Sequence, residues 1–277
     1  GKFWQLLEFA PESPAPATWP PVSIIVPARN EADMLAETLP ALLNQDYAGD
    51  WRVILVDDRS TDHTAAIAQK IATGHRNAAR FTLVQGVEPA QGWKGKVAAM
   101  QNGFNAATGN YVLFTDADIF HPPHSLRMLV TEASAKKLDM LSLMVKLRCT
   151  SFAEQLLIPA FVYFFQLLYP FRQSNDRDHS VAAAAGGVML LRKSVLDSIG
   201  GLSRIRDELI DDCALANVIK HECGGMTWLG LSRDVLSLRV YDGIKNVWEM
   251  IARTAFTQLH YSALMLVGCV AGLGLMF

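Results

Sequence analysis

Short apolar runs alternate with helical patterns over the first 115 residues, and this alternation restricts the possible folds more than any other feature of the chain. Each run expected to form a strand leads into a polar turn, which is followed by apolar residues at helical spacing. The pattern predicts an α/β domain with a mainly parallel, Rossmann-like sheet flanked by helices. The expected strands are 22–26, 51–56, 81–84 and 111–115, and the expected helices are 31–44, 64–72 and 96–107.

Apolar residues are concentrated in two later segments. The 277 residues are 51% apolar, more than a typical soluble domain holds, and the excess lies in 152–171 and 261–277. Two glutamines, a glutamate and the proline at position 159 favour an amphipathic, interfacial helix for 152–171 over a spanning one, although an internal helix beneath the site also fits. The uncharged segment 261–277 is consistent with the start of a transmembrane helix.

The two ends of the chain are expected to lie outside the main domain. Five prolines between positions 11 and 21 predict an extended, Pro-rich lead over 1–20, and the absence of an initiating Met leaves room for a membrane anchor ahead of it. The main domain is expected over 21–245. An interfacial segment and the start of a transmembrane helix are expected over 246–277.

Charge and cysteine content exclude several classes of protein. The formal net charge is −2 and no block of Lys and Arg is present, so nucleic acid is not an expected partner. The four cysteines are widely spaced without a C-x-x-C pair, which indicates neither a zinc site nor a disulfide framework.

Asp116-Ala117-Asp118 follows an apolar strand and is the sharpest chemical signal in the sequence. In an extended segment the side chains of residues i and i+2 point to the same side, so both carboxylates are expected to reach one hard cation. Mg²⁺ or Mn²⁺ suits such oxygen ligands and would bridge two phosphates of a nucleotide diphosphate. A solvated acidic turn is the alternative interpretation.

Polar residues also follow the first two expected strands. Ligands of open α/β sheets bind beyond the carboxyl ends of the strands, so these residues are candidates for binding the nucleotide. Asp58 is the first choice for recognition of the base or ribose, and Lys96, at an expected helix start, for a phosphate. The complete set of expected donor-binding residues at strand and helix ends is Pro27, Ala28, Arg29, Asn30, Glu31, Asp57, Asp58, Lys96 and Asp116.

The chain resembles family 2 glycosyltransferases of the GT-A fold from about residue 21 to residue 258. Within that family it is most similar to bacterial hopene-associated glycosyltransferases and, more distantly, to ceramide glucosyltransferases. The motifs that carry the resemblance, in chain order, are P-A-R-N-E, V-D-D-R-S-T-D-x-T, G-K-x-x-A-x-x-x-G at 95–103, D-A-D, G-G-V-M-L-L-R at 186–192 and D-D-x-x-L-A at 211–216.

The resemblance implies an inverting sugar transfer in which Asp57 and Asp58 hold a uridine and Asp118, with Asp116, binds the metal. Transfer with inversion needs a general base, and Asp212 is the candidate, although acids in a first helical turn are also favoured by the helix dipole. The Q-x-x-R-W motif of processive relatives is absent, so a single transfer is expected. Residues assigned to the acceptor region are Gly186, Gly187, Asp211 and Trp248, and Arg253 is assigned to the donor.

The expected substrates are a UDP-sugar and a lipid acceptor of hopanoid, sphingolipid-like or polyprenyl type. The expected location is the bacterial inner membrane, with the catalytic domain facing the cytoplasm. Two alternatives stay open: a nucleotidyltransferase, which would release pyrophosphate, and a non-catalytic membrane scaffold with a remnant nucleotide site. Simple packing is an equally good interpretation of Trp248.

Overall fold

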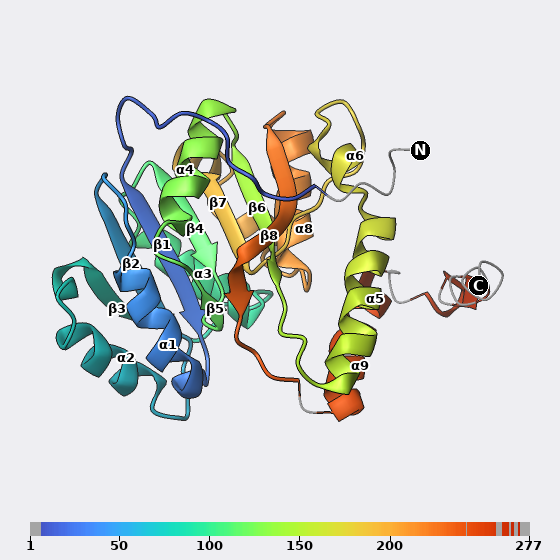
Figure 1. Cartoon of the computed structure of the whole chain (residues 1–277), viewed down its shortest axis with the longest axis horizontal. Helices are drawn as coiled ribbons and strands as arrows, with labels where there is room; N and C mark the ends of the chain where they lie inside the picture. The colour runs from blue at the N-terminus through green and yellow to red at the C-terminus, as the bar shows by residue number, and fades with distance from the viewer. Residues whose placement is uncertain (1–6, 242, 259–261, 266, 269–270, 272–277) are drawn as a thin grey trace. The chain divides into compact units, whose positions relative to one another are not determined.

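A computed structural model describes residues 7–241, 243–258, 262–265, 267–268 and 271. The chain divides into two compact units, which are treated separately below. The sheet unit comprises 1–148 and 168–239, and the helical unit comprises 149–167 and 240–277. The sheet and its covering helices can be followed in Figure 1.

The sheet unit contains one eight-stranded sheet with the strand order β3-β2-β1-β4-β7-β6-β8-β5. Its strands are β1 (Val22–Ala28), β2 (Trp51–Asp57), β3 (Phe81–Gln85), β4 (Tyr111–Thr115), β5 (Ile119–Phe120), β6 (Met140–Lys146), β7 (Val188–Arg192) and β8 (Thr227–Ser237). Its α-helices are α1 (Ala32–Leu43), α2 (Thr64–Thr73), α3 (Gly95–Asn105), α4 (Ser125–Ala135), α6 (Phe171–Asn175), α7 (Lys193–Ser198) and α8 (Asp211–Asn217). Short helical turns are η2 (Ala78–Arg80), η3 (Ser203–Ile205) and η4 (Val218–Glu222), the last a π-helix.

The strands β3, β2, β1 and β4 form a parallel half, and the seven predicted strands and helices of 22–115 are all present within a few residues of the expected bounds. The chain passes from β1 outward to β2 and β3 and then returns to β4 on the other side of β1. The sheet therefore has a topological switch point between β1 and β4, where ligands of open α/β sheets bind.

Pro27 lies inside β1, whereas the sequence pattern suggested that it ends the strand. Val22 N–H donates to Asp50 O on the β2 side, and by strand alternation the nitrogen of Pro27 lies on the β4 side. Pairing between β1 and β4 stops at Ile25. The missing N–H of Pro27 therefore leaves no ladder hydrogen bond unmade, as expected for proline within a strand.

The strands β7, β6, β8 and β5 form a mixed half, and here the expectation of a mainly parallel sheet is wrong. The pairs β4–β7, β6–β7 and β5–β8 are antiparallel, whereas β6–β8 is parallel. The alternation that predicts parallel strands covers only the first 115 residues, and these four strands all lie beyond it. The sheet is mixed.

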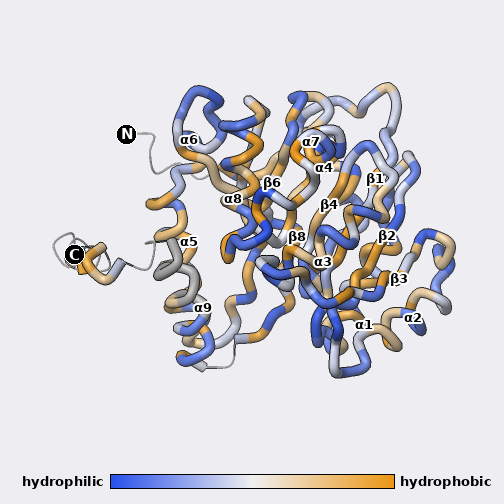
Figure 2. The backbone as a smooth tube through the Cα atoms, turned by 180° about the vertical axis from the view of Figure 1, so that it is seen from behind, coloured by the Kyte–Doolittle hydropathy of each residue, from blue (hydrophilic) through white to orange (hydrophobic). Residues whose placement is uncertain are grey.

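Helices cover both faces of the sheet, so its central strands β1, β4 and β7 are buried on both sides. One apolar cluster packs α1, α2 and α4 against residues such as Ile24, and the other packs α3, α7 and α8 against residues such as Ile25. Figure 2 shows the strands coloured mainly as hydrophobic. Gly103 on α3 has no room for a side chain, because an added Cβ would overlap Ile25 and come within 3.1 Å of Val56. Its bare backbone lets α3 lie close on β1 and β2.

Residues 7–21 are extended and not helical, as the prolines predict. The lead runs beside β8, where Phe9 N–H donates to Leu231 O (2.7 Å) and Leu231 N–H donates to Leu7 O (2.8 Å). Farther along, the carboxylate of Glu132 accepts hydrogen bonds from the N–H groups of Glu12 and Ser13. The described part of the lead is therefore attached to the sheet unit.

The helical unit contains α5 (Phe152–Leu168) up to residue 167 and α9 (Gly243–Gln258). Glu154 is 1% exposed, and its carboxylate accepts hydrogen bonds from the N–H groups of Thr150, Ser151 and Tyr241. These bonds lower the pKa of Glu154 to about 2, against a smaller opposing effect of burial. Among the described helices, none has both the length and the apolar character of a membrane span. The expected membrane helix at 261–277 falls largely outside the described residues.

Candidate active site

The loops after β1 and β2 are joined by hydrogen bonds between their polar residues. The carboxamide of Asn30 accepts from Thr61 N–H (2.8 Å), and Ser60 Oγ accepts from Asn30 N–H (3.0 Å). Asp62 accepts from Thr64 N–H (2.9 Å) at the start of α2 and from Ala32 N–H (3.2 Å) at the start of α1. Asp62 thus accepts a hydrogen bond from the first residue of each of the two helices. Asn30 has a φ of 56°, a conformation that Asn tolerates better than most residues.

Asp57 and Asp58 lie at the end of β2 and are both 5% exposed. Asp57 accepts a hydrogen bond from Ser60 N–H (3.3 Å). The carboxylate of Asp58 lies 3.6 Å from the guanidinium of Arg29 and 3.3 Å from that of Arg59. The two predicted nucleotide ligands therefore lie beside the carboxyl end of β1, and two guanidinium groups adjoin Asp58.

The N-terminus of α3 connects the parallel half to residues of the mixed half. An added Cβ on Gly95 would lie 3.3 Å from Asp58 Oδ2, so this glycine permits a close approach. The Nζ of Lys96 lies 2.9 Å from Asp116 Oδ1 and 3.7 Å from Asp211 Oδ2. Desolvation lowers the pKa of Lys96, but the surrounding carboxylates raise it more, so it stays charged.

Asp211 and Asp212 form the first turn of α8, where the dipole favours acids. An added Cβ on Gly186 would lie 3.3 Å from Asp212 Oδ2 and 3.4 Å from Lys96 Nζ, so the main chain of Gly186 adjoins both groups. Burial and the charge of Asp211 raise the pKa of Asp212 to about 6, against the charge of Lys96 and backbone hydrogen bonds. A carboxylate with such a pKa is suited to accept a proton near neutral pH.

Asp118 is 6% exposed, and its carboxylate accepts hydrogen bonds from residues at and just after the end of β8. Its Oδ2 accepts hydrogen bonds from Ser237 Oγ (2.9 Å) and from Nε of Arg239 (3.1 Å). Arg239 also donates through Nη2 to Glu31 Oε1 (2.7 Å). Sequence reasoning missed Arg239, since a lone arginine after a strand carries no signal of its partners.

The geometry of Asp116-Ala117-Asp118 differs from the extended segment that we expected. The segment is a turn, closed by a hydrogen bond from Ile119 N–H to Asp116 O (3.2 Å), so alternation of side chains does not apply to it. Asp116 pairs with Lys96 and Asp118 with Arg239. Within the described part of the chain, no three His, Cys, Asp or Glu side chains converge on one metal position.

A hydrogen-bonded chain lies beneath this turn and was also missed by sequence reasoning. Thr115 Oγ1 donates to Gly187 O (2.8 Å), so it must accept from His121 Nε2–H (2.8 Å). His121 Nδ1 then accepts from Ser125 Oγ (2.8 Å). Burial lowers the pKa of His121 to about 3, so the ring is neutral. These hydrogen bonds join the end of β4 to Gly187, a residue assigned to the acceptor region.

Two predicted site residues lie in the helical unit. Trp248 on α9 is 62% exposed. The side chain of Arg253 falls outside the described residues, so its assignment to the donor stays a prediction. The other predicted residues, from Pro27 to Asp212, lie at strand ends or helix starts of the sheet unit.

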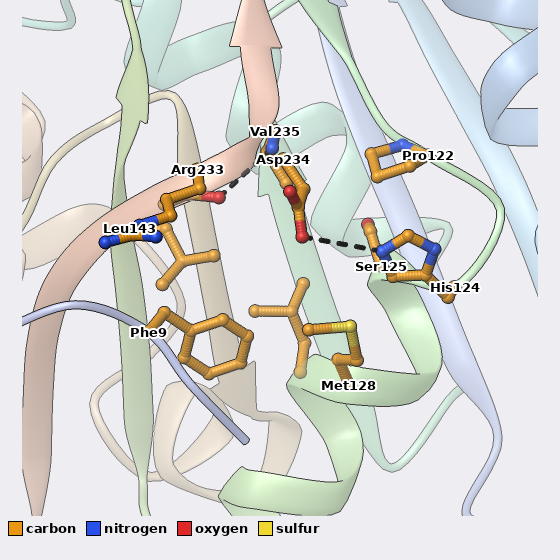
Figure 3. Close-up of a pocket in the computed structure, with 11 residues that line it drawn as sticks. Phe9, Pro122, His124, Ser125, Met128, Leu143, Arg233, Asp234 and Val235 are labelled. Carbon is orange, nitrogen blue, oxygen red and sulfur yellow. Dashed lines mark hydrogen bonds and ion pairs between the residues drawn. The ribbon is translucent and has the colours of Figure 1, made fainter.

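A separate pocket lies between β8 and α4 (Figure 3). Its lining includes Phe9 from the lead, Met128 and the ion pair between His124 and Asp234, whose side-chain atoms lie 3.7 Å apart. Apart from Ser125, it shares no residue with the site described above, and nothing in it resembles a set of nucleotide ligands.

Comparison with known proteins identifies relatives. The family model for "Glycosyl transferase family 2" matches residues 23–200. "Probable glycosyltransferase YdaM" of Bacillus subtilis is 25% identical over 186 residues, which are 66% of this chain and 43% of that protein. "Dodecaprenyl-phosphate galacturonate synthase" of Rhizobium johnstonii is 33% identical over 123 residues, 43% of this chain and 34% of that protein. The chain thus spans less than half the length of either relative.

The fold is also found among solved structures. The mannosyltransferase PcManGT of Pyrobaculum calidifontis, solved in complex with GDP-Man and Mn²⁺, superposes with a TM-score of 0.64 at 23% identity. The match covers 86% of this chain and 62% of that one. At this identity the likeness concerns the fold.

Proposed function

Because the chain belongs to glycosyl transferase family 2 and has a GT-A-like α/β fold, we propose that it transfers a single sugar, with inversion, from a nucleotide-diphosphate sugar to a lipid acceptor. A UDP-sugar is the favoured donor. The proposed acceptor is a hopanoid, a sphingolipid-like molecule or a polyprenyl derivative, and the proposed location is the bacterial inner membrane, with the sheet unit in the cytoplasm.

The observation that carries this proposal is the position of Lys96 between acidic groups from distant segments. Lys96 contacts Asp116 after β4 and Asp211 at the start of α8, while its neighbour Gly95 adjoins Asp58 at the end of β2. A diphosphate at the switch point would meet the cation of Lys96 and the N-terminus of α3, both of which favour phosphate. Asp58 is the proposed ligand of the nucleoside.

In the proposed reaction, the acceptor hydroxyl oxygen forms a bond to the anomeric carbon while the bond from that carbon to the diphosphate oxygen breaks. Asp212 takes the hydroxyl proton as the carboxylate, and the nucleoside diphosphate leaves with the bonding pair. Lys96 is proposed to lie near both the base and the diphosphate. It faces the Asp211–Asp212 turn on one side and Asp116 on the other. Its positive charge would stabilise the leaving diphosphate.

The residues fit a divalent metal by the type of donor atom that they offer. Asp118 has carboxylate oxygens beside the turn that follows β4, and hard cations such as Mg²⁺ often take few protein ligands and complete their shell with phosphates and water. We propose that Asp118, with Asp116, holds Mg²⁺ or Mn²⁺. When bound, such an ion offsets the negative charge that develops on the departing diphosphate.

Exposed apolar side chains in the helical unit support a membrane acceptor. Phe152 and Leu156 lie one helical turn apart on α5 and are 77% and 58% exposed. Ile244 and Trp248 have the same spacing on α9 and are similarly exposed. Such faces are suited to the interfacial region of a bilayer. The relative from Rhizobium johnstonii also has a polyprenyl phosphate in its name.

A donor screen tests the proposal. The purified chain is incubated with UDP- and GDP-sugars, Mg²⁺ or Mn²⁺ and a bacterial lipid extract, and mass spectrometry follows the lipids and the released nucleotide. We expect a lipid that gains the mass of one sugar, together with free nucleoside diphosphate. Release of pyrophosphate would instead indicate nucleotidyl transfer, and repeated addition of sugars would contradict a single transfer.

A further inference from the structure

Arg239 joins two acidic side chains of the proposed donor site. Its Nε donates to Asp118 Oδ2 (3.1 Å) and its Nη2 donates to Glu31 Oε1 (2.7 Å). Asp118 follows β4 and Glu31 follows β1, so the two acids come from opposite sides of the switch point. One guanidinium therefore connects the two strand ends between which the diphosphate is proposed to bind.

The end of β8 holds Arg239 in this position. Ser237 pairs with Ile119 across the β5–β8 ladder, Leu238 N–H donates to Asp118 O (2.9 Å), and Ser237 Oγ donates to Asp118 Oδ2 (2.9 Å). The side chain of Arg239 is 44% exposed, whereas that of Asp118 is 9% exposed. The carboxylate is thus already bound to a cation whose own outer surface remains accessible.

We infer that Arg239 is a built-in counter-cation that occupies Asp118 before the donor binds and couples the binding of metal and nucleotide. The inference rests on the proposed function. A divalent ion that approaches Asp118 alone meets a fixed positive charge and competes for the same carboxylate. A diphosphate removes this conflict, because its oxygens bind the metal and offer the guanidinium fork a new bidentate partner.

This arrangement makes the two ligands bind cooperatively. Metal alone binds weakly because it must displace Arg239 from Asp118, and nucleoside diphosphate strengthens metal binding because Arg239 then has phosphate to contact. By linkage, the metal strengthens nucleotide binding by the same factor. The role of Arg239 is therefore visible in equilibrium binding, independently of turnover.

Mn²⁺ titrations followed by electron paramagnetic resonance, with and without UDP, test the inference on the whole chain. For the parent protein we expect UDP to tighten Mn²⁺ binding by about tenfold or more. In Arg239→Met, Mn²⁺ alone should bind about tenfold more tightly than to the parent, and UDP should add much less. Arg239→Lys keeps the charge and should retain weak binding of Mn²⁺ alone.

Arg233→Met is the matched control, since Arg233 lies on β8, six residues before Arg239, and pairs with Glu8 away from the site. It should leave both titrations unchanged. If Arg239→Met fails to fold, Arg239→Gln serves the same comparison. The inference is overturned if the parent binds UDP and Mn²⁺ but the Arg239 variant binds Mn²⁺ alone no more tightly. Absence of UDP binding to the parent, with or without Mn²⁺, would overturn the proposed function as well.

Discussion

The two halves of the sheet supply polar side chains to the proposed site in different ways. In the parallel half, Asp58 follows β2 directly and Asp118 lies in the turn after β4, so the ends of these strands place both side chains. In the mixed half, Gly186 precedes β7, Asp212 lies in the first turn of α8 and Arg239 follows β8. The parallel half thus supplies the proposed nucleotide ligands from the ends of its strands. The mixed half contributes the proposed base and a counter-cation through segments that only the folded chain brings near.

This difference predicts that the parallel half serves donor binding and the mixed half serves catalysis. Asp212→Asn tests this prediction and has the largest expected effect. Loss of a general base reduces the rate typically by about 10²–10⁴-fold. Donor binding should stay within about threefold of the parent value, because Asp212 acts on the acceptor in the proposed scheme. Steady-state sugar transfer and calorimetric donor binding measure the two quantities.

Asp207→Asn is the control for this variant, since Asp207 belongs to the same acidic run but is exposed. It should transfer sugar at the parent rate. If the Asp212→Asn protein turned over at the parent rate, Asp212 would not be the general base.

Lys96 connects the halves, and its removal should change the pH dependence of the reaction. The proposed base must be ionised, so the parent rate should fall as the pH drops through the pKa of Asp212 at about 6. The charge of Lys96 lowers that pKa, so Lys96→Met should move the acid limb of the kcat/KM profile to higher pH. A rise of one pKa unit, from about 6 to about 7, lowers the ionised fraction by about twofold at pH 7 and by about tenfold at pH 5, so the loss of rate should grow as the pH falls.

Lys94→Met is the matched control, as Lys94 is exposed one position before α3. It should keep the parent pH profile. An acid limb that stays in place in Lys96→Met would show that Lys96 does not act on the base.

Gly103 tests the packing that holds the parallel half together. Gly103→Ala inserts a methyl group against Ile25 and Val56, and such overpacking costs about 1–3 kcal/mol. Urea unfolding measures the change in the free energy of unfolding. Gly74→Ala is the control, because its added Cβ would meet only ordinary contacts at 3.6 Å. Equal stabilities of the two variants would mean that α3 does not need the close approach.

The smallest expected effect concerns the helical unit and its exposed apolar residues. Trp248→Ser should weaken partition of the protein onto anionic lipid vesicles by a few-fold, because it removes apolar area from an interfacial face. Vesicle sedimentation measures the bound fraction. Val87→Ser is the control, since Val87 is similarly exposed but lies in the sheet unit. Equal losses in both variants would argue against a specific interfacial role of α9.

Local pattern was enough to predict the parallel half and much of the site. Strands ended by polar turns and separated by amphipathic helices are a local signal, so β1 to β4 and the positions of Asp57, Asp58, Asp116 and Asp118 could be predicted. The same reasoning did not predict β5 to β8. Their partners lie far away in sequence, and every pairing of these strands spans more than 40 residues.

Individual side-chain contacts could not be predicted from the local sequence pattern either. The partners of Lys96 and Arg239 depend on which strand ends adjoin each other in the folded chain. The turn at Asp116-Ala117-Asp118 replaced an expected extended segment because its main chain closes on itself at Ile119. Sequence therefore predicted which residues are polar at the site, but not how their charges are paired.

The most direct test of the central claim is a calorimetric titration of UDP with Mg²⁺ into the parent protein, Asp58→Asn and Asp118→Asn. If these two residues from separate strand ends serve one nucleotide diphosphate, each variant should weaken binding by about tenfold or more, and Asp234→Asn on β8 should not. Parental affinity in either of the first two variants would contradict the claim.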